Sequence, residues 1–167
     1  QTLEVLTTVL NAYGMSADKV STVSDMLVQT QNKGKVTVGE LASSMGKIIP
    51  TANASNVSLE QLCAGYAIMT SKGIAAAETT TYMNSMLNEL SKSGSTTDKL
   101  LRQKMGVSFA ELMASGKSLG EILGGIQEEA NKSGLALSDM FSSSEAGKAA
   151  MSLLSNGVDG FNSSVQD

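Results

Sequence analysis

Residues 57–69 read VSLEQLCAGYAIM, and this stretch decides the fold. Its apolar side chains recur at the spacing i, i+3, i+4, i+7 and i+8, at Leu59, Leu62, Cys63, Tyr66 and Ala67. That spacing puts one apolar stripe on one face of an α-helix. Ser58 and Gln61 stand three residues apart at its start, so each side chain can bond the other's free backbone N–H. The stretch therefore predicts a capped helix over residues 59–71.

The same two signals, an apolar stripe and a capping pair, recur along the chain. Further stripes lie at 20–28, 83–90 and 119–126, and further Ser/Thr-x-x-Glu pairs are Thr37/Glu40, Ser108/Glu111, Ser118/Glu121 and Ser142/Glu145. The alternation typical of strands is nearly absent. We therefore predict an all-α fold, a compact globular array of about 9–11 short helices with no significant sheet. The expected helices are 2–12, 17–31, 38–48, 59–71, 75–92, 97–105, 109–114, 119–132, 136–141, 144–156 and 159–165.

Glycine and proline mark the expected helix ends. Pro50 is expected to close the third helix, with 51–56 as a loop, because proline cannot continue a helix. The linker KSGSTT at 92–97 divides the chain into residues 1–92, an N-terminal helical half, and 93–167, a C-terminal helical half of the same domain. Glycines are expected in the left-handed conformation just past seven helices. These are Gly34, Gly73, Gly94, Gly106, Gly116, Gly134 and Gly157.

The composition excludes several classes of protein. The 167 residues carry no His, which removes most zinc sites and every nucleophile pair that needs imidazole. One cysteine excludes an internal disulfide framework. A net charge of −4 argues against a dedicated nucleic-acid domain, since such domains are usually basic. Apolar residues make up 41%, which is enough for a packed core and argues against intrinsic disorder.

No stretch is long enough to cross a membrane. The longest apolar run, Cys63–Met69, has seven residues, whereas a spanning helix needs about 20. The first ten residues include Glu4 and have no basic segment, so we expect no signal peptide. The chain starts without Met and already inside an apolar helical pattern, which favours a piece of a longer protein.

The residues that could carry chemistry favour structural roles. Cys63 sits on an apolar helical face with no cation nearby, as expected of a small buried hydrophobe. Residues 125–133 superficially match a phosphate loop but have Ala130 and Asn131 where the motif needs Gly and Lys. Gly120, Gly124 and Gly125 favour close helix packing over a ligand site. The paired acids 128 and 129 are expected to form a solvated face. The lysines 33 and 35 flank Gly34 in a turn and are too few to bind phosphate backbones specifically. We predict no catalytic, cofactor-binding or metal residues, no cofactor and no small-molecule ligand.

Ten methionines are many for a chain of this length. Met83 and Met86 fit a core stripe, and we expect six others, at 26, 69, 105, 113, 140 and 151, in or near similar stripes. An alternative is an adaptable interaction surface, because methionine repacks against varied partners. The low charge, 17%, agrees with association, since such a surface has few features that oppose it.

Several motifs together resemble the core region of phage tail tape measure proteins. The resemblance covers nearly the whole chain and is strongest over residues 10–91. Its motifs are LNAYGMSA at 10–17, Asp25, TxxELA at 37–42, PxA at 50–52, VSLEQL at 57–62, GYAxMT at 65–70, GIAxAE at 73–78 and TTTYMNSMLNEL at 79–90. The C-terminal motifs, MGVS at 105–108, GxxAxxLL at 147–154 and GxxxF at 157–161, match more loosely. The family often has Ala-Gly-Thr where this chain has Glu78, Thr79 and Thr80, which should alter one helix contact only.

The resemblance implies a structural virion protein and no enzymatic activity. Tape measure proteins set the length of a siphophage or myophage tail, occupy the tail tube during assembly in the bacterial cytoplasm, and leave ahead of the DNA at ejection. Complete members carry long coiled segments and apolar segments that this chain lacks. It therefore resembles the globular core module. The implied partners are other copies of the tape measure protein and the tail-tube, tail-tip or baseplate proteins, with no specific nucleic-acid binding.

Two alternatives stay open on the residues alone. A non-viral helical adaptor would have the same stripes and caps. A cell-wall hydrolase would need a pair of carboxylates in a cleft. With no His, three Tyr and three Phe, the chain offers few of the groups that line such a cleft.

Overall fold

The helix predicted over residues 59–71 lies at the centre of the structure. The computed structural model describes residues 2–166, and α5 (Leu59–Ser71) contacts α2, α6, α10 and α11. Nine of its thirteen residues are buried. A helix that is apolar nearly all round belongs in a core. The single stripe expected from the sequence is thus too narrow, because Ala64, Gly65 and Met69 are buried beside it.

The regular secondary structure of residues 2–166 is entirely helical, so the predicted all-α class is confirmed. The other α-helices are α1 (Thr2–Ala12), α2 (Val20–Lys33), α3 (Val38–Ser44), α4 (Ile49–Ala54), α6 (Ala76–Ser91), α7 (Thr96–Met105), α8 (Phe109–Ala114), α9 (Leu119–Lys132), α10 (Ser144–Leu153) and α11 (Gly157–Gln166). Three short 3-10 helices, η1 (Ala17–Lys19), η2 (Met45–Lys47) and η3 (Leu137–Met140), lie between them.

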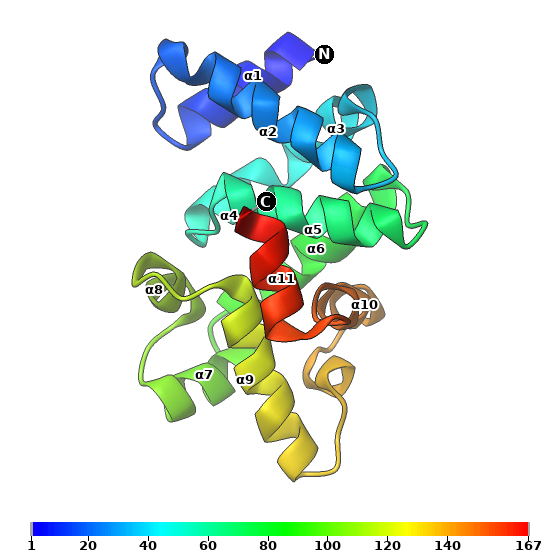
Figure 1. Cartoon of the computed structure of the whole chain (residues 1–167). Coiled ribbons are helices and arrows are strands. Elements are labelled where there is room, and N and C mark those ends of the chain that lie inside the picture. The colour runs from blue at the N-terminus through cyan, green and yellow to red at the C-terminus, as the bar shows by residue number, and fades with distance from the viewer. Residues whose placement is uncertain (1, 167) are drawn as a thin grey trace.

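The helices are arranged along one long direction (Figure 1). One end holds α1, α2 and α3, the middle holds α4, α5 and α6, and the other end holds α7, α8 and α9. The last two helices return to the middle, where α10 packs on α6 and α5, and α11 packs on α5 and α9. Late and early segments therefore share one core, and the division at residues 92 and 93 stays a prediction.

The region around Pro50 forms a helix, α4. The prediction of a loop at 51–56 is therefore wrong. Proline stands in its first turn, where the missing N–H would have had no helical partner anyway. Asn56 then ends the segment with a φ of 63°. Its side-chain amide donates to the Ala110 carbonyl at 3.0 Å. The Asn56 side chain thus ties this turn to a backbone carbonyl of α8.

Three of the five expected capping boxes form completely, at Thr37, Ser108 and Ser118. Ser58 accepts from the Gln61 N–H, but the Gln61 side chain instead accepts from the Leu119 N–H at 2.6 Å. The pair at 142 and 145 is wrong, because Ser143 is the N-cap of α10 and Ser142 bonds Glu89. These departures arise because a distant helix offers a competing partner.

Six of the seven expected left-handed glycines have positive φ, but Gly34 does not. Its backbone is extended, with φ −104° and ψ −172°. A Cβ at this position would lie 2.3 Å from Thr70 Oγ1 and 3.1 Å from the Ala67 backbone. Gly34 therefore ends α2, as predicted, but without the left-handed conformation, and it allows the close approach of the chain to α5.

We predict that Gly34→Ala lowers the free energy of unfolding by roughly 1–3 kcal/mol, the usual effect of overpacking. Thr70 and the α5 backbone leave the new methyl no room. Gly46→Ala is the matched control, because a Cβ there meets nothing within 4 Å. Urea denaturation of both variants measures the difference, and equal stability of the two would contradict this packing.

Candidate functional site

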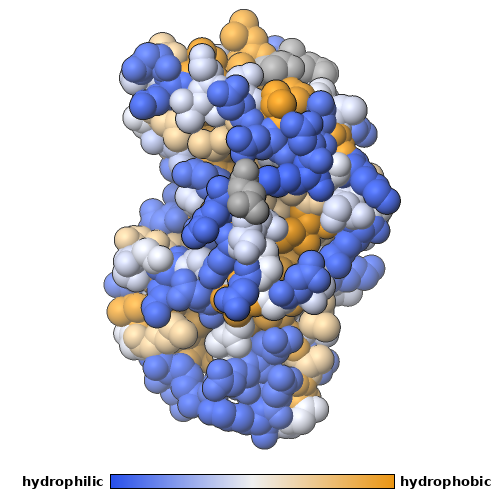
Figure 2. All heavy atoms as spheres, viewed as in Figure 1, coloured by the Kyte–Doolittle hydropathy of each residue, from blue (hydrophilic) through white to orange (hydrophobic). Residues whose placement is uncertain are grey.

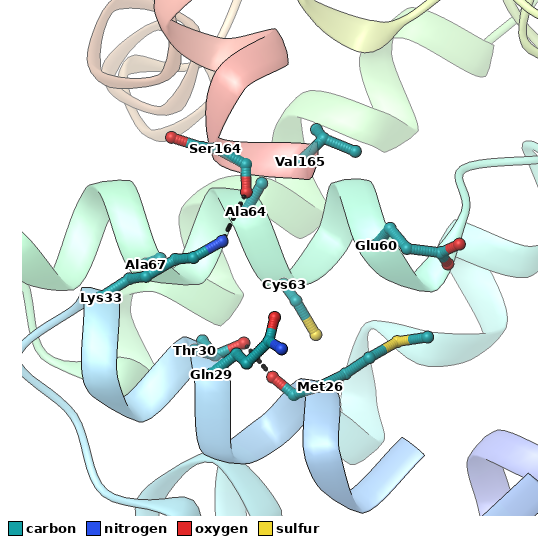
Figure 3. A pocket seen from close by; sticks show the side chains of 10 residues that line it. All are labelled: Met26, Gln29, Thr30, Lys33, Glu60, Cys63, Ala64, Ala67, Ser164 and Val165. Carbon is teal, nitrogen blue, oxygen red and sulfur yellow. Dashed lines mark hydrogen bonds between the residues drawn. The ribbon is translucent and has the colours of Figure 1, made fainter. Parts of the chain in front are cut away.

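A small cavity lies between α2, α5 and α11 (Figure 3). Its volume is about 60 Å³, which holds a few water molecules but is far below the roughly 300–1,000 Å³ of ligand pockets. Lys33 Nζ closes one side by donating to the Ser164 carbonyl at 3.2 Å. The lining residues are Met26, Gln29, Thr30, Lys33, Glu60, Cys63, Ala64, Ala67, Ser164 and Val165.

Cys63 lies in this lining, on the side of α5 that faces α2 (Figure 3). Its side chain is buried, as the sequence predicts. Burial raises the pKa of the thiol to about 11, because a thiolate would lose its hydration there. The thiolate is the reactive form of cysteine, so Cys63 is an inert packing group at neutral pH.

The glycines of α9 serve close packing, as predicted. A Cβ at Gly120 would lie 2.9 Å from the Phe161 ring, and one at Gly124 would lie 2.5 Å from Val158 Cγ2. Both contacts are with α11, whereas Gly125 faces the end of Met105. Because Gly120 and Gly124 have no side chains, α11 can pack closely against α9.

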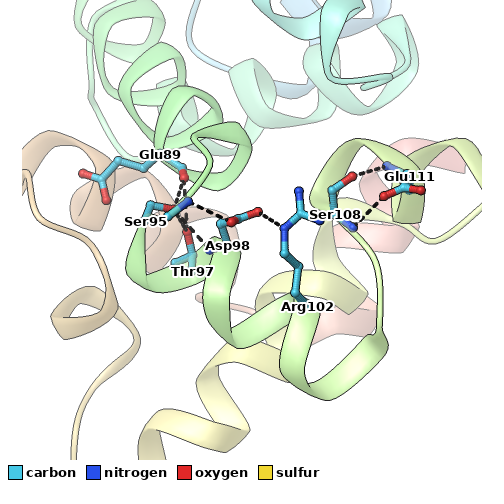
Figure 4. Close-up of polar contacts among 8 residues, drawn as sticks. Glu89, Ser95, Thr97, Asp98, Arg102, Ser108 and Glu111 are labelled. Atoms are coloured by element: carbon cyan, nitrogen blue, oxygen red, sulfur yellow. Dashed lines mark hydrogen bonds and ion pairs between the residues drawn. The ribbon is translucent and has the colours of Figure 1, made fainter.

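Glu89 joins α6 to the turn that follows it and to a segment more than 50 residues away. Its carboxylate accepts from the Ser142 N–H, the Ser142 hydroxyl and the Ser143 N–H, at 2.9, 2.9 and 2.8 Å. Its backbone carbonyl accepts from the Ser95 and Thr97 hydroxyls (Figure 4). One residue of α6 therefore positions the starts of α7 and α10.

The carboxylate of Glu89 is held in its charged form. Partial burial opposes ionisation, but the hydrogen bonds from Ser142 and Ser143 outweigh it, so the pKa lies below the ordinary value of 4.5. The sequence offered no sign of this role, because the partners stand 53 and 54 residues away. The segment 92–97, expected as a linker, is a tight turn followed by the first two residues of α7, and it is fixed by the same residue.

Asp98 is the most buried charged side chain near this turn (Figure 4). It accepts from the Gly94 N–H and from Arg102 Nε, both at 2.9 Å. The Gly94 N–H, followed by Arg102, lowers the pKa of the Asp98 carboxyl. The Asp98 carboxylate thus joins the turn at Gly94 to the first turn of α7, whereas the Arg102 side chain is 52% exposed.

The acids expected to be solvated differ from each other. Glu128 is exposed, but Glu129 lies between Lys104 and Lys132, at 3.1 and 3.0 Å. Across residues 2–166, no cluster of three His, Cys, Asp or Glu side chains could hold a metal ion. The absence of catalytic, cofactor and metal residues stays a prediction. The Lys104–Glu129 ion pair connects α7 to α9, whereas the Lys132–Glu129 pair lies within α9.

Most methionines fill the core, as the first of the two readings predicts. Six are buried, while Met105 and Met151 are 38% and 43% exposed. The face in Figure 2 is mostly hydrophilic, with hydrophobic atoms at the α1 end and beside α11. Other large exposed apolar side chains are Leu3, Val20, Val28 and Leu135.

None of the helices within residues 2–166 has the length and apolar character needed to span a membrane.

Comparisons with known proteins give one consistent family. A family model described as phage-related minor tail protein matches residues 1–154. A "probable tape measure protein" of Clostridium phage phiCD119 is 41% identical over 151 residues, covering 87% of this chain and 16% of that protein. A "tape measure protein" of Pneumococcus phage Dp-1 is 26% identical over 106 residues, covering 64% and 9%. No solved structure matches the chain.

We predict that the Cys63 thiol in the folded chain is protected from a thiol reagent such as Ellman's reagent at pH 8. Burial and the raised pKa both suppress the thiolate. Labelling of the chain in 6 M guanidinium should be at least about a hundredfold faster, because an unfolded thiol ionises near pH 8.5. Equal rates in the folded and unfolded chain would contradict this placement.

We predict that Glu89→Gln lowers the free energy of unfolding at pH 7 by about 1–2 kcal/mol, allowing for partial exposure. Because the folded pKa of Glu89 is lowered, its stabilisation is complete above pH 4.5 and is lost as the pH falls through the folded value. The difference from the unmodified chain should therefore shrink at pH 3. Denaturation at both pH values tests this, with the exposed Glu128→Gln as control.

Proposed function

Because this chain belongs to the phage-related minor tail protein family, we propose that it is the globular core module of a tape measure protein, with a part in tail assembly and tail-length determination. The observation that carries the proposal is the 41% identity to a probable tape measure protein across most of the chain. The chain spans a sixth or less of the length of the relatives it matches. The activity of a whole tape measure protein is therefore part of the proposal.

The shape of the module favours an anchor over a ruler. A ruler works by its length, and 167 helical residues in one rod would reach about 250 Å. A folded domain of this size is only about 30–40 Å across. In Figure 1 the chain reverses direction many times and packs into a core, so it does not extend as a rod. In this proposal the measuring length comes from other parts of the parent protein.

The proposed partners are other copies of the tape measure protein and the tail-tube, tail-tip or baseplate proteins. The exposed side chains of Leu3, Val28, Leu135 and Met151 give the surface apolar points for such contacts. Its net charge of −4 disfavours the phosphate backbone of nucleic acids. We place the module in the virion tail, after assembly in the bacterial cytoplasm.

The test is tail length after two in-frame deletions in the phage gene that encodes this chain. The first removes a stretch of predicted long helix outside residues 1–167, and the second removes residues 10–160. We expect the first to shorten tails by about 1.5 Å per deleted residue, the rise of a helix. We expect the second to abolish tails or their tips. Negative-stain electron microscopy measures both results.

A synonymous recoding of residues 10–160 controls for effects on the gene instead of the protein. Tails of normal length and structure after both deletions would overturn the proposal. Tails shortened by the second deletion in proportion to the residues removed would make this module part of the ruler, and would overturn its role as an anchor.

A further inference from the structure

The last helix, α11, lies in a groove that other helices shape for it. Its apolar side chains, Val158, Phe161 and Val165, follow the spacing i, i+3 and i+7. They meet α9 at Gly120 and Gly124, and α5 beside Ala64 and Ala67. Both groove walls therefore present small residues to large ones, and Figure 1 shows α11 at the front of the molecule.

Although the groove fits its large side chains, α11 as a whole is weakly held. Of the residues of α11 that the structure describes, only Phe161 is fully buried. Two glycines, Gly157 and Gly160, weaken the helix itself. The Asn162 Oδ1 atom is buried there without a hydrogen-bond partner, and the cavity of about 60 Å³ leaves α11 imperfectly seated on α5. Such a segment opens at a smaller free energy than the whole fold.

The connection to α10 is short and can extend. Only residues 154–156 separate α10 from α11, and the Gly157 N–H closes their turn on the Leu154 carbonyl at 2.9 Å. Gly157 has a φ of +76°. Extending this one turn would carry α11 away from its own groove as a unit. Short hinges of this kind favour the exchange of an element between copies.

We propose that the groove formed by α5 and α9 accepts α11 from a second copy of this chain. The occupant follows from the shape of the groove, because the Gly120 and Gly124 positions fit Phe161 and Val158, which every copy carries. The contacts within one chain and between two chains are the same, so concentration decides which form prevails. The inference rests on the proposed function for its setting, in which other copies of the tape measure protein are partners of this chain.

The test is disulfide trapping between two single-cysteine chains. One carries Cys63→Ala and Gly124→Cys, and the other carries Cys63→Ala and Val158→Cys. A Cβ at 124 lies 2.5 Å from Val158 Cγ2, so the two β-carbons lie no more than about 4 Å apart, which suits a disulfide. We expect the oxidised mixture to give a covalent dimer joined through positions 124 and 158.

The control mixture pairs the Gly124→Cys chain with one carrying Cys63→Ala and Leu3→Cys. Leu3 is 73% exposed and lies on α1, so it reports random collision. The exchange pair should form at least about tenfold more dimer than this control, because exchange raises the effective concentration. Equal yields from the two mixtures would overturn the proposal.

A second measurement avoids dependence on the Gly124→Cys substitution alone. A single chain with Cys63→Ala, Gly124→Cys and Val158→Cys should form the disulfide internally and lock α11 in place. We expect the Cys63→Ala chain to dimerise as its concentration rises in analytical ultracentrifugation, and the locked chain to stay monomeric. Dimerisation of both chains would mean that copies meet at another surface, and would overturn the exchange.

These experiments use the purified 167-residue chain and need no phage. Failure of the exchange would leave the tail phenotype of the deletions unaffected. Normal tails after the deletions would overturn the proposed function while leaving a trapped dimer in place. The two failures are therefore distinguishable.

Discussion

The burial of α5 on four sides is the constraint on which the rest of the structure depends. Helices α2, α6, α10 and α11 pack against it, and they come from both halves of the chain. It can be surrounded because its sequence has small residues where neighbours approach closely. Gly65 is one such position, since a Cβ there would lie 2.5 Å from Met83 Sδ. Tyr66 adds a polar contact inside this core, a hydrogen bond between its hydroxyl and Thr80 of α6.

Hydroxyl groups make many of the side-chain hydrogen bonds around that core. Serine and threonine side chains cap helices, bond the backbone one turn back, or bond a carboxylate on another helix. These bonds satisfy buried polar groups without bringing unpaired charge into the interior. The low charge of the sequence agrees with this, because hydroxyl hydrogen bonds fix the C-terminal helices and few ion pairs are needed.

The sequence predicted the helices well because their signals are local. Apolar spacing and capping pairs lie within one or two turns, and the structure confirms nearly every helix within a few residues. The errors fall where distant residues decide. Gly34 is extended because of Thr70, and Ser142 is taken from its expected pair by Glu89. Pro50 shows a local ambiguity instead, since proline both ends helices and begins them. The cavity beside Cys63 could not be predicted at all, because α11 forms one of its walls.

The position of α10 has a consequence for synthesis on the ribosome. Residues 144–153 cover α6 and α5, so the central helices keep an open apolar face until this segment has been made. A nascent chain that ends before Ser142 also lacks the partners of the Glu89 carboxylate. Contacts between residues this far apart form late and slow folding. The growing chain therefore exposes an apolar face of α5 and α6 until residues 144–153 have been made, and chaperones protect such surfaces from aggregation in that period.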